Sequence, residues 1–162
     1  MRRRFLLLGA AATLAGCGFT LKRPPELAFK TIQLNGFAAR SPLAAELRTS
    51  LEASPTTRVV ESVGEAQVVL QALSEAREKV VVAQTSASQI REFELRLRFT
   101  FRVRSATGKD LLPDSEIVQR RSLTYTESAA LAKEQEEAFL YRSMQSDIVS
   151  QVLRRLASVR LL

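Results

Sequence analysis

The segment from Glu92 to Arg104 reads EFELRLRFTFRVR and alternates apolar and polar residues without interruption. An alternation with a period of two is typical of a β-strand that buries one of its faces. The sequence therefore predicts a long strand whose apolar side packs beneath other elements. Its polar side consists mostly of arginine, at Arg96, Arg98, Arg102 and Arg104.

We call these four residues the arginine row, and it raises a functional question. Residues two apart on a strand share a face, so the row extends over roughly 27 Å. Close like charges are unfavourable unless carboxylates or a ligand balance them. Two interpretations stay open: Glu94 and the acidic start of the last helix balance the row, or the row binds an anion through guanidinium groups that match phosphates. Arg120, on the next predicted strand, is a candidate fifth member.

The rest of the chain alternates strand and helix patterns and indicates an α+β domain. Ser41-Pro42 is a typical helix start, and Leu43, Leu47 and Leu51 follow on one helical face. The sequence predicts strands at 29–34, 67–83, 92–104 and 116–126, and helices from Ser41 to Ser54 and over 128–159. A bulge or bend is expected near 74–79, and 58–63 is either a short strand or an irregular extended piece. We therefore expect a four-stranded, mostly antiparallel sheet with two helices packed on one face, in the order β-α-β-β-β-α.

The N-terminus has the pattern of a bacterial lipoprotein signal. Three arginines precede an apolar run, which ends in Leu14-Ala15-Gly16-Cys17 with the only cysteine of the chain. We expect residues 1–16 to be the signal peptide, Cys17 to carry the lipid, 17–28 to form a lipid-anchored linker and 29–162 to form one domain. The alternative is an ordinary secretion signal with a cysteine nearby. Gly18, rather than aspartate, favours the outer membrane, and both Sec and twin-arginine export stay open.

Composition excludes several classes of chemistry. The chain has 24 basic and 17 acidic residues and no histidine, so histidine-activated nucleophiles are excluded. We expect no metal and no cofactor other than the covalent lipid on Cys17. The cluster Glu134, Glu136 and Glu137 is best interpreted as the acidic first part of an amphipathic helix, not as a catalytic pair. Net basic charge favours a phosphate-bearing or lipid partner, and export argues against nucleic acid.

Several segments together resemble the lipopolysaccharide-assembly lipoproteins of the LptE family. The start of the mature chain, Cys17 to Lys22 (CGFTLK), is similar, as are the element order and the segment from Tyr125 to Leu156. The resemblance implies a non-enzymatic outer-membrane lipoprotein, anchored by lipid on the periplasmic side. It also implies a protein that plugs and helps to assemble a large β-barrel translocon and binds lipopolysaccharide during its delivery to the cell surface.

The resemblance also assigns binding residues. Lys133 matches a family lysine near the start of the last helix that is implicated in lipopolysaccharide binding. The family's second basic site lies at a hairpin tip, which here reads Thr85 to Ser88 without a basic residue, and Arg91 is the nearest. We therefore predict lipopolysaccharide contacts at Lys133, Arg91, Arg96, Arg98, Arg102 and Arg104. Acidic groups of the barrel wall are an alternative partner for the arginines, and a structural chaperone that binds no lipopolysaccharide is the alternative function.

Overall fold

The structure is a computed structural model that describes residues 26–160. The predicted signal peptide, the lipidation site Cys17 and most of the predicted linker lie outside the described residues. The strands are β1 (Thr31–Asn35), β2 (Arg58–Val60), β3 (Val68–Gln84), β4 (Ile90–Ser105) and β5 (Asp110–Thr124); the α-helices are α2 (Pro42–Glu52) and α3 (Ala130–Ala157), and two short 3-10 helices are η2 (Val63–Glu65) and η3 (Glu127–Ala129).

The strands form one mixed sheet in the order β2-β1-β3-β4-β5. β1 runs parallel to both β2 and β3, whereas β3, β4 and β5 pair antiparallel. The prediction of an α+β domain is correct, but the predicted four-stranded, mostly antiparallel sheet needs correction, because β2 adds a fifth strand and β1 is parallel to both of its neighbours. β2 pairs with β1 over only three residues, which is too short for a clear alternation in the sequence.

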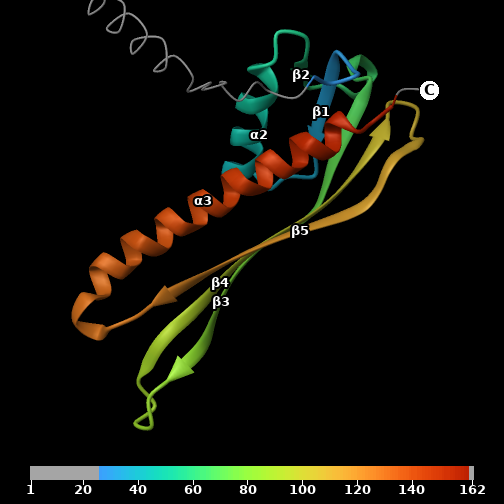
Figure 1. Cartoon of the computed structure of the whole chain (residues 1–162). Helices are drawn as coiled ribbons and strands as arrows, with labels where there is room; N and C mark the ends of the chain where they lie inside the picture. Colours follow the sequence, from blue (N-terminus) through green and yellow to red (C-terminus); the bar gives the residue numbers. More distant parts are fainter. Residues whose placement is uncertain (1–25, 161–162) are drawn as a thin grey trace, which may run out of the picture.

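Both helices cover the same face of the sheet, as predicted (Figure 1). The alternating apolar residues of β4 meet the helices there, and Leu95, Phe99, Phe101 and Val103 are fully buried. A buried side chain of this size contributes roughly 1.5–3 kcal/mol. From the helices, the core receives Leu43, Leu47 and Leu51 of α2 and Met144, Ile148, Val152 and Leu156 of α3.

The start of α2 shows why the sequence forms a helix there. The Ser41 hydroxyl accepts a hydrogen bond from the Ala44 backbone N–H at 3.2 Å, and Pro42 occupies the first helical position. Both features favour a helix start. The Ser41 hydroxyl provides an acceptor for a backbone N–H that has no partner within the helix, and proline has no N–H that would need one. No helix within residues 26–160 is long and apolar enough to cross a membrane.

The β3–β4 hairpin is longer than the helical layer that covers it. β1 pairs with β3 only from Val68 to Gln71, and the register of β3 against β4 shifts between Ala72 and Ser74. This bulge lies at the beginning of the segment 74–79, where the sequence predicts a bulge or bend. Figure 1 shows the hairpin projecting past the turn between β5 and α3. The opposite face of the sheet carries no helix within the described residues, and that uncovered face holds the arginine row.

Candidate functional site: an ion-paired arginine face

Strand alternation places the whole arginine row on the uncovered face of β4. The residues between its members are buried beneath the helices, so the even-numbered side chains must point the other way. The row therefore exists as a surface feature, as the sequence predicts. The side chains are 27–39% exposed, which leaves each guanidinium partly in contact with solvent.

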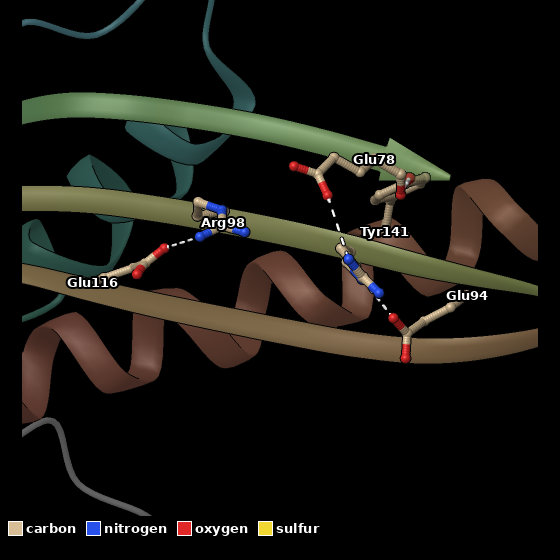
Figure 2. Close-up of polar contacts among 6 residues, drawn as sticks. Glu78, Glu94, Arg98, Glu116 and Tyr141 are labelled. Atoms are coloured by element: carbon tan, nitrogen blue, oxygen red, sulfur yellow. Dashed lines mark hydrogen bonds and ion pairs between the residues drawn. The ribbon is translucent and has the colours of Figure 1, made fainter. Parts of the chain in front are cut away.

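Every member of the row has a carboxylate partner on the same sheet. Figure 2 shows one pair, in which Arg98 on β4 reaches Glu116 on β5. The partners come from all three antiparallel strands, because directly paired or diagonal residues share a face. The ion pairs are Arg96 with Glu94 and, at 3.9 Å, with Glu78; Arg98 with Glu116; Arg102 with Asp114 at 2.8 Å; and Arg104 with Asp110 at 2.8 Å.

This ladder of ion pairs confirms internal balancing, one of the two interpretations that the sequence left open. Partly exposed ion pairs each contribute only about 0–1 kcal/mol to stability, so the ladder is not a major source of it. Its physical effect is to hold the guanidinium groups in fixed orientations across the face. Binding of an external anion by the same groups stays a prediction.

The expected source of the balancing charge was partly wrong. Glu94 pairs with Arg96 as expected, but the acidic start of α3 lies on the helical side of the sheet. There Glu137 pairs with Lys79 at 2.6 Å, and Glu136 pairs with Lys133 at 2.8 Å. The partners from β5 were overlooked. The predicted strand began at Glu116, and register shifts against β4 break the alternation between Asp110 and Ser115, so parity alone could not place Asp110 and Asp114 on this face.

Lys133 and Arg91 lie apart from the arginine row. The Lys133 ammonium donates to the Thr124 hydroxyl at 3.1 Å, at the end of β5, and its side chain is 19% exposed. Arg91 is exposed and lines a cavity of about 250 Å³ together with Thr126, Glu127 and Ser128. Both residues therefore flank the turn from β5 into α3, so the structure separates the predicted contacts into a sheet face and a distal pair.

A second basic pair, which the sequence analysis overlooked, lies on the helical face of β3. The Arg77 guanidinium stacks over the Tyr141 ring at 5.2 Å, and the Lys79 ammonium lies 4.3 Å from the centre of the Phe93 ring. A cavity of about 460 Å³ is lined by Arg77 of β3 and by Glu134, Glu137, Ala138 and Tyr141 of α3. The register shift between Ala72 and Ser74 moves the helical face of β3 from even-numbered to odd-numbered residues, so alternation along the strand could not have located this pair.

Tyr141 closes one side of this cavity, and its environment predicts a pH dependence. Burial and the nearby Glu137 carboxylate raise the pKa of Tyr141 above its ordinary value of 10.0, while Arg77 acts in the opposite direction. Because the folded pKa is the higher one, the neutral hydroxyl stabilises the fold fully below pH 10, and this contribution is lost as the pH rises through the folded pKa.

We expect Tyr141→Phe to lower the free energy of unfolding by about 0.5–1.5 kcal/mol at pH 7, because the hydroxyl donates to the Glu78 carbonyl at 2.8 Å. Above pH 10 the difference between the two proteins should shrink. Urea denaturation at pH 7 and pH 11 measures both effects. A difference that is constant between these pH values would contradict the assignment.

The profile of the family described as "LptE: Lipopolysaccharide-assembly" matches residues 29–156. An uncharacterized lipoprotein B from Nitrosomonas europaea is similar, with 29% identity, a TM-score of 0.76, and coverage of 87% of this chain and 91% of that one. No curated protein gives a significant match.

Two further structures share the fold at 22% identity each. Rare lipoprotein B from Shewanella oneidensis has a TM-score of 0.68, with coverage of 80% of this chain and 95% of the other. A minor lipoprotein from Acinetobacter baumannii has a TM-score of 0.66, with coverage of 82% and 94%. The mixed sheet with two helices on one face is therefore a shared architecture and not peculiar to this sequence.

Proposed function

This chain belongs to the LptE family of lipopolysaccharide-assembly proteins, and from that premise we propose that it is a non-enzymatic lipoprotein of the outer membrane. In this proposal the domain occupies a large β-barrel translocon, helps it to assemble, and binds lipopolysaccharide during delivery to the cell surface. The lipid on Cys17 holds the domain on the periplasmic side of the membrane. Lipoprotein relatives with the same fold support the anchored state.

The observation that carries the binding part is the uncovered sheet face with its oriented guanidinium groups. A guanidinium group can donate two parallel hydrogen bonds to a phosphate, as it can to a carboxylate. Each arginine of the ladder donates one hydrogen bond to a carboxylate, through one nitrogen, so its other N–H groups are the donors that we propose for a phosphate of lipopolysaccharide. The rigid antiparallel strands keep the row at fixed spacing, which suits a ligand with several separated phosphates.

The distal pair supplies a second contact region in this proposal. Arg91 is exposed next to a cavity at the turn from β5 into α3, and Lys133 lies at the same turn. Lys133 is already held by Glu136, so its contribution requires exchange of that partner as well. The separation of the two regions suits a large amphiphile better than a small anion.

A second candidate function is a structural chaperone of the barrel that binds no lipopolysaccharide. The observation in its favour is the ladder itself, because each arginine of the row already has a carboxylate partner. A face balanced in this way suits the polar inner wall of a barrel, where arginines and carboxylates both find partners.

Affinity purification tests the part of the proposal that both functions share. The acylated, C-terminally tagged protein is purified from detergent-solubilised outer membranes, and the co-purifying proteins are identified. We expect a large β-barrel protein in stoichiometric amount. A tagged Cys17→Ala variant, which cannot be acylated, is the control for anchoring. Recovery of the acylated protein without any barrel partner would contradict the proposal.

A further inference from the structure

The outer edge of β3 has no partner strand over its distal half. β1 pairs with β3 only as far as Gln71, and the chain then turns away at Gly36. Beyond Gln71, β4 is the only strand within residues 26–160 that pairs with β3. We call the regular stretch from Ser74 to Val81, which has a register shift at each end, the free edge. Figure 1 shows this part of the hairpin continuing past the end of β1.

The hydrogen bonds of β4 show which backbone groups of the free edge point outward. The Arg91 carbonyl accepts a hydrogen bond from the Tyr125 N–H, and the Ser105 N–H donates to the Lys109 carbonyl, both on the side of β5. Odd-numbered residues of β4 therefore bond to β5 and even-numbered ones to β3, because the two directions alternate along a strand. The residues of β3 that lie opposite odd-numbered residues must direct their N–H and C=O groups outward, and these are Glu75, Arg77, Lys79 and Val81. No strand and no side chain within residues 26–160 bonds to these outward groups.

The outer edge of β5, by contrast, is blocked. Its outward carbonyls at Glu116 and Arg120 accept hydrogen bonds from the guanidinium groups of Arg155 at 3.2 Å and of Arg121 at 2.8 Å. Pro113, which has no N–H to offer, lies in the same strand. Proteins commonly protect edge strands from pairing by such means. The free edge of β3 has neither protection within the described part of the chain.

The charged side chains of the free edge contact the domain itself and are not left to oppose an approaching strand. Each has a partner on a neighbouring element: Glu75 accepts from the Ser41 hydroxyl at 2.8 Å, Arg77 stacks over the Tyr141 ring, Glu78 lies 3.9 Å from Arg96, and Lys79 pairs with Glu137 at 2.6 Å. Uncompensated charge at an edge opposes pairing with another chain. Here that charge is balanced within the domain.

Two cavities follow the helical side of the free edge, and Arg77 lines both. One, of about 350 Å³, lies against the loop before α2 at Ala38 and Ala39. The other, of about 460 Å³, lies against α3 at Ala138 and Tyr141. Alternate side chains of a strand added beside β3 would point to this side of the sheet. The alanines leave room for those side chains, so the space beside the free edge fits an extended chain.

We propose that the free edge is a docking site for an extended segment of the β-barrel partner, which adds to the sheet as a strand beside β3. This inference rests on the proposed function and names the surface that holds the partner. Outward backbone groups at strand spacing are recognised by another extended backbone, and the cavities select its alternate side chains. Strands of a closed barrel are already paired on both sides, so the segment lies outside the barrel wall. A domain inside one barrel is enclosed by that barrel, which makes the barrel, and not a second copy of this chain, the source of the strand.

Amide hydrogen exchange at single-residue resolution tests the docking site on the acylated protein, both free and co-purified with the barrel. In the free protein the amides of the free edge should alternate, with even-numbered residues slow and the odd-numbered Arg77, Lys79 and Val81 fast. In the complex we expect these three amides to slow at least about ten-fold, so that the alternation disappears. Fast exchange of the three amides in the complex would overturn the inference.

Proline variants test the same site by co-purification. Val81→Pro removes an outward N–H of β3 without removing a bond to β4, and Ser122→Pro does the same at the outer edge of β5. We expect Val81→Pro to lower the recovery of the barrel at least about five-fold and Ser122→Pro to leave it unchanged. Equal recovery by the two variants would overturn the docking site.

A second variant keeps the test valid if Val81→Pro does not fold. Ala138→Trp fills the cavity against α3 and leaves every backbone group of the free edge intact. Ser146→Trp, at another exposed position on α3, is its matched control. We expect the two tryptophan variants to have similar melting temperatures and only Ala138→Trp to lose the barrel. Recovery of the barrel by both would overturn the docking site.

The outcomes separate this inference from the proposed function. If the wild-type protein and Val81→Pro recover the barrel equally, the docking site fails and the proposed function stands. If the wild-type protein recovers no barrel, the proposed function fails and the docking site fails with it. Sedimentation of the purified wild-type protein tests the other occupant. A dimer that Val81→Pro dissociates would assign the free edge to a second copy of the chain and would overturn the inference.

Discussion

Phe99→Ala is expected to lower the free energy of unfolding by about 3–5 kcal/mol, a large fraction of the stability of a domain of this size. Phe99 is fully buried, and its ring stacks on Phe101 with 5.3 Å between centroids and on Phe37 with 5.7 Å. Removal of the ring leaves a cavity where β4 meets the loop that follows β1. Neighbouring aromatic rings are too rigid to fill it completely.

Urea denaturation of Phe99→Ala measures this effect, and Phe139→Ala is the matched control. Phe139 lies on α3 with 62% of its surface exposed, so the same truncation should change stability by less than about 0.5 kcal/mol. Similar losses for the two variants would contradict the assignment of the core to the helical face of the sheet.

Gly36→Ala is expected to destabilise the junction between β1 and β3 by at least about 2 kcal/mol. Gly36 has a φ of +77°, which alanine adopts only with strain. A Cβ at this position would lie 2.3 Å from the Ala72 carbonyl oxygen, which is backbone and cannot move aside. The close approach exists because β1 ends at Asn35 and the chain turns away beside the bulge of β3.

Gly108→Ala separates backbone strain from the steric clash. Gly108 also has a positive φ, of +87°, but nothing lies within 4 Å of its added Cβ. The difference in unfolding free energy between the two alanine variants therefore measures the clash alone. Hydrogen exchange shows where the clash destabilises the domain. In Gly36→Ala we expect the loss of amide protection to be confined to β1 and β2. Equal effects of the two substitutions would contradict the close packing of Gly36 on β3.

The sequence predicted those parts of the fold in which local pattern and burial agree. The period of two in β4 and the apolar stripe of α3 each specify one buried face, and the structure has both faces where predicted. The start of α2 was predictable because Ser41 and Pro42 act locally. For β2 the sequence left a short strand or an irregular piece open at 58–63, and the structure has the strand. Its place in the sheet was not predictable, because three residues have no recognisable period and their pairing with β1 depends on the path of the whole chain.

The candidate site was predictable in outline and not in detail. Strand alternation alone put the arginine row on one face, but it could not supply the register between β4 and β5. That register decides that Glu116 meets Arg98 and that Arg120 lies opposite Arg96. The sequence also could not show that the acidic start of α3 lies on the helical face of the sheet, away from the arginine row. Sequence spacing places residues on one side of a helix, but tertiary packing decides which face of the sheet the helix covers.

Binding of purified lipopolysaccharide to the acylated full-length protein, compared with the variant Arg96→Glu/Arg98→Glu, tests the central claim most directly. The matched control is Arg142→Glu/Arg154→Glu, which reverses two exposed charges on α3. If the arginine face is the ligand surface, reversal on β4 should weaken binding at least about ten-fold, while the control variant keeps wild-type affinity. Equal affinity of all three proteins would contradict the account and would leave the ladder as a structural feature of the sheet.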